Sequence, residues 1–238
     1  MSSRFVRGTC FTVSALLTSY SSAVMASSAF VDKVYHPYVL PLERELEWRI
    51  GFNEQDDHPD DNTMTQSIAF GHSINERVTV ELYLTGERLP QEKFKLIAYE
   101  LEARWMITEQ GEYDIDWGAM FEFEKEKGES GWELSAGLLA EKEFGRTSLT
   151  GNFFVIYETG EKEKEAEMRL QYRYRWIPQV QPGIELFVGD DFMGIGPAFM
   201  GIHRFDGQKQ LKWEAGFIFG LDNETPNHSF KFGLEYEF

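Results

Sequence analysis

Strict alternation along the last nine residues, Phe230 to Phe238, most constrains what this chain can fold into. Apolar side chains occupy the even positions, and polar side chains or glycine occupy the odd ones. Successive side chains of a β-strand point to opposite faces, so the segment predicts a strand with one apolar face and one polar face. The polar face carries Lys231, Glu235 and Glu237. Such a strand separates an apolar environment from water.

The same two-residue period recurs along most of the chain. It predicts twelve strands, one of which, at 97–107, is long enough to cross a bilayer when tilted. The facing of the strand at 195–205 stays open, because Pro197 indicates a bulge or a strand end there. The predicted strands are 46–52, 67–71, 78–84, 97–107, 113–124, 132–138, 149–157, 168–176, 184–188, 195–205, 211–219 and 230–238.

The closing segment resembles the last strand of bacterial outer-membrane β-barrels, in which a terminal aromatic residue belongs to the signal read by the assembly machinery. The resemblance implies an all-β fold, a closed antiparallel transmembrane barrel of about twelve strands in an up-and-down meander. It also implies a place in the outer membrane of a Gram-negative bacterium, in contact with lipid and lipopolysaccharide. The residues that would carry the assembly signal are Phe230, Phe232, Leu234, Tyr236 and Phe238.

A secreted soluble β-sandwich is the alternative fold, since its strands also alternate, with the apolar face toward a core. It does not explain the terminal phenylalanine, the long strands or the difference between two sets of connections. An even strand number places both termini at the periplasmic end, so the connections after odd-numbered strands lie outside. These outer connections are mostly longer and more acidic than the inner ones.

The first residues indicate export. Arg4 and Arg7 precede a weakly apolar stretch, and Val24-Met25-Ala26 has the small-residue pattern of a signal-peptide cleavage site. Two prolines and no clean period follow, which indicates a periplasmic lead-in, with insertion into the barrel mouth as an open alternative. The expected divisions are a signal peptide at 1–26, the lead-in at 27–41 and the barrel at 42–238.

Charge and cysteine content exclude several classes of function. The chain carries 23 lysines and arginines against 40 acidic residues, an excess that argues against a nucleic-acid partner. Its one cysteine, Cys10, falls in the signal peptide, so the mature chain has no disulfide, thiol nucleophile or thiolate metal site. No run of 18 apolar residues follows the signal peptide, which excludes a spanning helix but not a barrel with interleaved polar residues.

If the apolar face meets lipid, the other face lines a lumen whose charges are unevenly distributed. Acids dominate the early strands, whereas the strand at 168–176 brings three arginines. In a closed ring of twelve strands, that arginine column lies opposite the acidic wall. The predicted lumen residues are Arg169, Arg173, Arg175, Glu45, Glu47, Glu81, Glu100, Glu102, Arg104, Asp114 and Asp116.

Two functions remain open. In the first, the two walls flank a narrow water-filled path, and the protein is a monomeric porin for small polar solutes or ions. In the second, the charges bridge the lumen, and a sealed barrel acts as a structural or binding protein through its acidic outer loops. We favour the porin, because twelve strands lie between filled small barrels and open porins.

Catalytic interpretations are weaker. The acidic run from Asp56 to Asp61, with Asp190 and Asp191, resembles the acid and histidine chemistry of omptin proteases, but that family has ten strands and larger outer extensions. Gly71-His72-Ser73 resembles the His/Ser pair of the outer-membrane phospholipase, yet the expected topology puts it at a periplasmic turn. An outer-membrane hydrolase is therefore a remote alternative, and no enzyme, cofactor or metal site is predicted. Loop acids bridged to lipopolysaccharide by divalent cations are the other interpretation of the acidic run.

Overall fold

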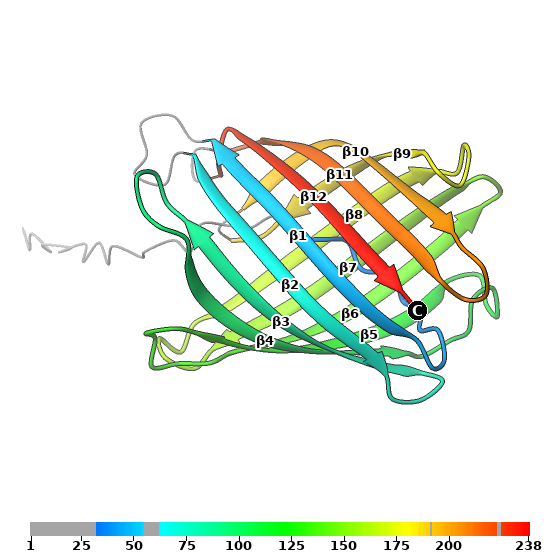
Figure 1. The fold of residues 1–238 in the computed structure, drawn as a ribbon, viewed down its shortest axis with the longest axis horizontal. Coiled ribbons are helices and arrows are strands. Elements are labelled where there is room, and N and C mark those ends of the chain that lie inside the picture. Colours follow the sequence, from blue (N-terminus) through cyan, green and yellow to red (C-terminus); the bar gives the residue numbers. More distant parts are fainter. Residues whose placement is uncertain (1–31, 55–61, 191, 223–224) are drawn as a thin grey trace, which may run out of the picture.

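Twelve strands form one closed antiparallel barrel within the residues that the computed structural model describes, which are 32–54, 62–190, 192–222 and 225–238 (Figure 1). Each strand pairs with its neighbours in sequence, and β1 pairs with β12, so the predicted meander is confirmed. The strands are β1 (Arg44–Glu54), β2 (Thr63–Ser73), β3 (Val78–Arg88), β4 (Lys95–Met106), β5 (Asp116–Glu126), β6 (Glu133–Phe144), β7 (Thr147–Glu158), β8 (Lys164–Tyr174), β9 (Gln181–Val188), β10 (Met193–Arg204), β11 (Gln210–Gly220) and β12 (His228–Glu237).

The last strand closes the barrel against the first. In the register of β1 and β12, Phe52 lies opposite Phe230. Beyond the end of β12, the Phe238 amide donates to the Arg44 carbonyl oxygen at 2.8 Å, and the Arg44 amide donates to the backbone oxygen of Phe238 at 3.2 Å. Closure leaves no unpaired sheet edge, which is the condition for a sheet to sit in lipid.

Side chains are arranged inside out relative to a soluble protein. On β1, Leu46 is 51% exposed whereas Glu47 is 6% exposed. On β4, Leu101 is 44% exposed whereas Glu102 is 1% exposed. Polar groups therefore face the interior and apolar groups cover the outer wall, as in a transmembrane barrel. A soluble sandwich would bury its apolar face, so that alternative is wrong.

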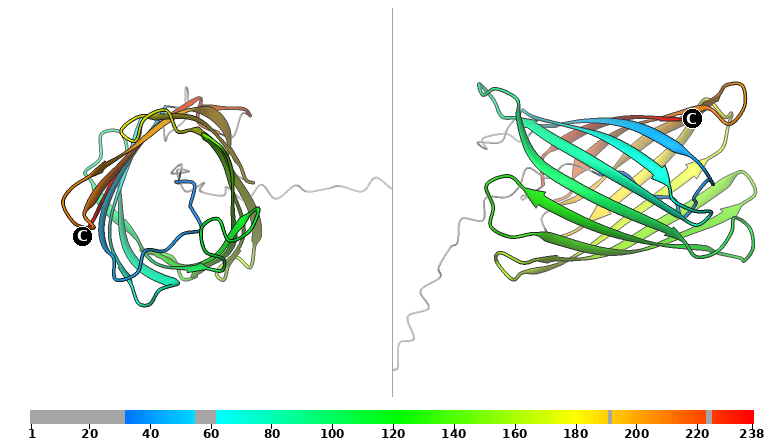
Figure 2. Two further views of the ribbon diagram at one scale, coloured as in Figure 1. Left: turned by 90° about the vertical axis from the view of Figure 1, so that its right-hand side faces the viewer. Right: turned by 60° about the horizontal axis from the view of Figure 1, so that its bottom comes forward.

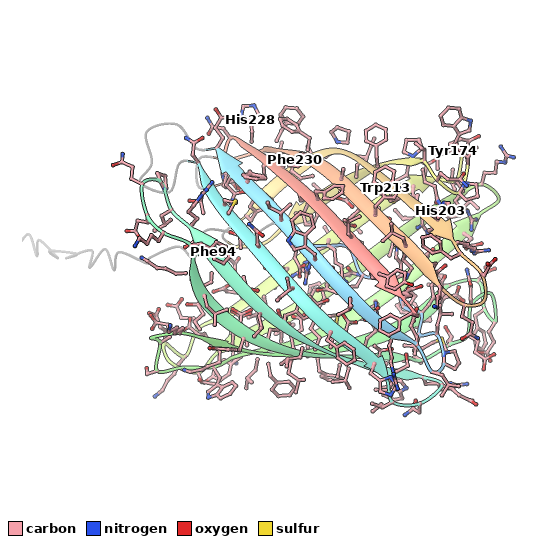
Figure 3. The ribbon with its side chains drawn as sticks, viewed as in Figure 1. Phe94, Tyr174, His203, Trp213, His228 and Phe230 are labelled. Carbon is pink, nitrogen blue, oxygen red and sulfur yellow. The ribbon has the colours of Figure 1, made fainter. Side chains whose placement is uncertain are left out.

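Aromatic side chains are found near both ends of the outer wall. Phe94 and Phe230 lie toward one end of the barrel, and Tyr174 lies toward the other (Figure 3). Aromatic girdles of this kind mark the two boundaries between water and lipid in membrane barrels. Within the described chain, no helix has the length and apolar character needed to cross a membrane.

We call the end at which β1 begins and β12 finishes the terminal end, and the opposite one the far end. Connections at the far end span four to eight residues, and those at the terminal end span two to nine. The predicted difference in length is therefore small. The main reason is the connection at 107–115, which lies at the terminal end and is longer than the sequence predicts.

This connection is longer than the stretch at 108–112 that separates the predicted strands. β4 finishes at Met106 and β5 begins at Asp116, so the sequence alternation extends beyond the paired strands. The Asp116 carboxylate accepts a hydrogen bond from the Gly111 amide at 2.9 Å, and Gly111 adopts a φ of 74°. A local carboxylate bond and a left-handed glycine thus form a compact loop where a continued ladder was expected.

The strand whose facing the sequence left open is β10. Ile195, Pro197 and Phe199 point outward, and Gly196 and Ala198 point inward. Its pairing with β11 is interrupted at Gly196 and Pro197, because proline has no amide to donate. A Cβ at Gly196 would lie 1.8 Å from the Phe217 carbonyl oxygen, so this close approach requires glycine.

Candidate permeation path

Most of the predicted lumen residues lie inside the barrel. On the acidic side, Glu45, Glu47, Glu81 and Glu102 are buried, and Glu100 and Arg104 are half-buried. On β8, Arg169 is buried and Arg173 is half-buried. Asp116 is buried at the terminal end of β5. Strand alternation places each of these side chains, since every other residue of a strand faces the same side.

One predicted lumen residue lies elsewhere, and another lies at the rim of the lumen. Asp114 belongs to the connection at 107–115, and its side chain is 99% exposed, so its assignment to the lumen is wrong. The cause is the early finish of the β4–β5 ladder. Arg175 follows β8 and sits at the rim, where its guanidinium donates to Glu143 at 2.6 Å. Arg175 therefore continues the arginine column as far as the rim, where it still lines the lumen.

Residues 32–39 lie inside the barrel. The ring seen along its axis encloses the blue segment that precedes β1 (Figure 2). Val34 packs against Phe187 and Ile218, and Tyr35 contacts Phe154 in an edge-on geometry with ring centroids 6.3 Å apart. Sequence reasoning left this insertion as an alternative to a lead-in outside the barrel. The signal for it was the presence of large apolar residues on the otherwise polar faces of strands β7, β9 and β11.

An ionic clamp fixes the start of this segment. The Asp32 carboxylate binds Arg49 of β1 on one side and Arg169 of β8 on the other, the latter at 2.7 Å. Burial opposes ionisation of Asp32, but the two guanidinium groups outweigh it and hold the pKa of this carboxyl below its usual range. Lys33 donates to Glu47 at 2.6 Å. The clamp therefore joins two sides of the ring through one residue.

Three further residues tie the segment to the wall. The Tyr35 amide donates to the Asn152 side chain at 2.8 Å, and the Asn152 side chain donates back to the Tyr35 carbonyl at 2.8 Å. His36 contacts Glu141, and the Tyr38 hydroxyl donates to Asp116 at 2.8 Å. The segment is therefore bonded to strands on both halves of the ring.

A cavity of about 760 Å³ remains between this segment and the terminal end. Its wall includes charges of both signs, among them Glu45, Glu47, Arg104, Arg173, Lys212 and Glu235. Lys212 donates to Glu235 at 2.8 Å, and Arg104 donates to Glu81 at 2.9 Å. Acids and bases therefore neutralise one another around this inner chamber.

Toward the far end, carboxylates of β3 to β6 face each other directly. Glu81 lies opposite Glu102, and Glu102 lies opposite Glu122. One step further along the strands, Glu124 lies between Glu100 and Glu133. Like charges in direct cross-strand pairs are destabilising, so this arrangement is not explained by the stability of the fold. We call these six residues the acid ladder.

The acid ladder is poorly neutralised. Four of its members form no salt bridge among the described residues, and these are Glu100, Glu122, Glu124 and Glu133. The basic residues nearby pair with other acids, namely Glu102, Asp32 and Glu167. In the described chain, the arginines of β8 form no salt bridge with the acid ladder, whereas the sealed-barrel alternative would require one. Arg169 binds Asp32 and Glu167, each at 2.7 Å. Local pairing with neighbours on the same side, and with the inserted segment, takes the place of a bridge across the ring.

The histidine and serine singled out for catalysis do not form a nucleophile and base pair. Nδ1 of His72 lies 3.1 Å from the Glu43 carbonyl oxygen, and the Ser73 hydroxyl pairs with that of Thr79 at 2.9 Å. The acidic run at 56–61 lies outside the described residues, as do Asp191 and the expected cleavage site. In the part of the chain that the structure describes, two groups of three carboxylates are close enough to hold a metal ion, Glu43 with Glu45 and Glu237, and Glu100 with Glu102 and Glu122.

Solved structures that share this architecture are outer-membrane channels. An outer membrane channel from Pseudomonas putida F1 aligns with 87% of this chain and 99% of its own, with a TM-score of 0.60 and 14% sequence identity. The KdgM porin aligns with 82% of this chain and 99% of its own, with a TM-score of 0.57 and 11% identity. No protein-family model matches the sequence, and no curated protein matches it. The likeness concerns the fold, and the predicted outer-membrane β-barrel fold is confirmed.

Proposed function

We propose that this protein is an outer-membrane channel for small polar solutes that prefers cations and is narrowed by its own inserted segment. The acid ladder is the observation that carries the proposal. Four of its carboxylates have no salt bridge in the described chain, so their charge acts on whatever occupies the lumen. Rings of acidic side chains select cations in this way, because water near a low-dielectric wall screens them weakly.

The charge of the ladder also separates this chain from one of its structural neighbours. The KdgM porin has been solved in complex with oligogalacturonate, which is an anionic sugar polymer. A wall of directly paired carboxylates repels such a molecule. We therefore infer a different solute class for this barrel, namely cations and neutral polar molecules small enough to pass residues 32–39.

A sealed barrel is the second candidate, and the inserted segment favours it. Asp32 joins β1 to β8, and Tyr35 and Tyr38 reach β4, β5 and β7, so the segment crosses much of the lumen. Solutes then pass only if water remains beside the segment or if the segment moves. The two functions differ in whether the wild-type barrel conducts.

Planar-bilayer recording of the refolded mature protein tests the proposal. Steady unitary currents with a reversal potential on the cation side in a salt gradient support it. A membrane that stays silent although the protein is inserted and folded overturns it in favour of the sealed barrel.

A tethered variant shows whether the segment moves. A Cβ at Gly118 would lie 3.0 Å from Cβ of Pro37, close to the roughly 3.5–4.5 Å that a disulfide requires. The variant P37C/G118C therefore links the segment to β5 when oxidised, in a mature chain expected to lack other cysteines. A lower conductance in the oxidised than in the reduced form indicates a moving segment, and equal conductance indicates a fixed constriction. The single variant G118C controls for the added side chain.

The remaining expectations belong to the same proposal. We infer a monomer without a chemical step, exported by a signal peptide and delivered to the outer membrane by the assembly machinery. The pairing of Phe238 with Arg44 supports a role of the last residue in closure. Deletion of Phe238 should lower the amount of heat-modifiable protein in the outer membrane. Unchanged amounts would remove the terminal aromatic from the assembly signal.

A further inference from the structure

The group formed by Glu100, Glu102 and Glu122 is more than a part of the acid ladder. Glu102 and Glu122 are direct cross-strand partners on β4 and β5, and Glu100 lies two residues before Glu102 on the same face. One carboxylate oxygen from each residue lies within 4.8 Å of the others. Three oxygens that carry negative charge therefore converge on one point beside the inserted segment.

The Glu102 carboxylate is only half satisfied by the protein. Glu102 is 1% exposed, and its Oε2 atom has no hydrogen-bond partner among the described residues. Its other oxygen, Oε1, lies 2.8 Å from the Tyr35 hydroxyl and 4.0 Å from the Arg49 guanidinium. A buried carboxylate oxygen without a donor is costly unless a ligand satisfies it.

The other group of three carboxylates, Glu43 with Glu45 and Glu237, forms ion pairs with basic residues of the same lumen. Glu237 binds Lys212, and Glu45 lies 3.9 Å from Arg104. In the group around Glu102, neither Glu100 nor Glu122 has a lysine or arginine within salt-bridge distance among the described residues. The nearest arginine of β8, Arg169, is committed to Asp32 and Glu167. Of the two groups, the one around Glu102 is the less neutralised, since its one ion pair in the described chain is that of Glu102 with Arg49 at 4.0 Å.

We propose that Glu100, Glu102 and Glu122 bind one divalent cation of the size of Ca²⁺. The proposal names an ion bound by the acid ladder, but it does not depend on conduction through the barrel. Oxygens on opposite sides of a Ca²⁺ ion lie about 4.6–5.2 Å apart, because each Ca–O distance is about 2.3–2.6 Å. The observed separation therefore admits Ca²⁺ without rearrangement. Mg²⁺ requires oxygens at about 2.0–2.1 Å and a near-ideal octahedron, so it fits this group less well.

Half-buried carboxylates lead from the far end to the site. Glu124 and Glu133 continue the ladder outward and are partly exposed. They attract a cation toward Glu100, which is also half-buried. The bound ion would lie next to Tyr35, whose hydroxyl contacts Glu102, so the site adjoins the inserted segment. The same ion would also neutralise the charge that the cross-strand pair of Glu102 and Glu122 concentrates.

Calorimetric titration of the refolded full-length mature protein with CaCl₂, in a non-ionic detergent at neutral pH, tests the site. We expect saturable binding of one equivalent, weakened at least tenfold in E100Q/E122Q. The matched control E43Q removes a carboxylate from the neutralised group and should leave binding unchanged. Titration with MgCl₂ should give weaker binding than CaCl₂.

Three results would overturn the site. These are no saturable binding to the wild type, wild-type binding in E100Q/E122Q, or an equal loss in E43Q. If the double variant does not fold, as judged by heat-modifiability, the single variant E100Q replaces it, because Glu100 is half-buried whereas Glu122 is buried. Binding in detergent does not require a conducting barrel, so a failure of this site and a failure of the channel are separate results.

Discussion

The wall of β3 to β6 and the wall of β9 to β12 use the same kinds of residue in opposite ways. On the second wall, Lys231 pairs with Glu185 at 2.9 Å, and Lys212 pairs with Glu235 at 2.8 Å. On the first, Glu124 faces Glu100 and Glu133, and none of the three forms a salt bridge within the described chain. Paired charges stabilise a filled interior, whereas adjacent like charges leave a field for water and ions to satisfy. The comparison identifies the first wall as the one that acts on solutes.

The largest effect should come from removing the segment that separates the two walls. Replacing residues 32–38 by a glycine and serine stretch of equal length removes Tyr35 and the Asp32 clamp from the lumen. We expect unitary conductance to rise several-fold, because these side chains occupy the cross-section of the path. Planar-bilayer recording measures the change. An unchanged conductance would mean that ions follow a route beside the segment, and the two walls would then act independently of it.

Neutralising the acid ladder should change selectivity rather than conductance. In E124Q/E133Q we expect the ratio of cation to anion permeability to fall roughly fivefold, because one unit charge at about 4 Å in water is worth about 1 kcal/mol. Reversal potentials in a salt gradient give the ratio. The control is E161Q, an exposed glutamate in the connection after β7. A similar loss in E161Q would assign selectivity to the mouth rather than to the ladder.

Breaking a salt bridge outside the acid ladder tests whether the two walls differ because one has neutralised charges and the other does not. Arg173 donates to Glu141 at 3.4 Å, so R173Q leaves a carboxylate less well neutralised and should shift selectivity toward cations by about twofold. The melting temperature should also fall, because Glu141 is buried. R175Q is the matched control, since its pair with Glu143 is exposed and worth about 0–1 kcal/mol. Equal changes of selectivity and melting temperature in R173Q and R175Q would contradict a special role of the buried pair.

The smallest effect should come from mild acid. The pKa of Asp32 is held below its usual value, so its clamp contributes above the unfolded pKa and is lost only as pH falls through the lower folded value. The difference in conductance between D32N and the wild type should therefore be the same at pH 5 as at pH 7. Comparing D32N with the wild type at each pH cancels the effect of other titrating groups on conductance. A wild type that behaves like D32N at pH 5 would show that the clamp is not ionic.

Much of the wall could be predicted from alternation alone. Leu46 and Glu47 on β1, or Leu101 and Glu102 on β4, face opposite sides because a strand allows no other arrangement. Alternation predicted the wrong structure where local hydrogen bonds replace the backbone pairing between strands. Asp114 kept the period but lies in a loop formed by the Asp116 carboxylate and Gly111. On β10, the facing followed only from pairing with both neighbours around Pro197.

The sequence by itself determined the barrel, its twelve strands and the sign of its lumen, because each depends on a period of two and on composition. Only the tertiary structure decided which charges neutralise one another. Pairing of Lys231 with Glu185 joins β12 to β9, and the clamp at Asp32 joins β1 to β8, across separations that no local pattern encodes. Long side chains reach several neighbours in a closed ring, so their partners depend on register and shear. The convergence of Glu100, Glu102 and Glu122 is decided in the same way, by the register of β4 against β5.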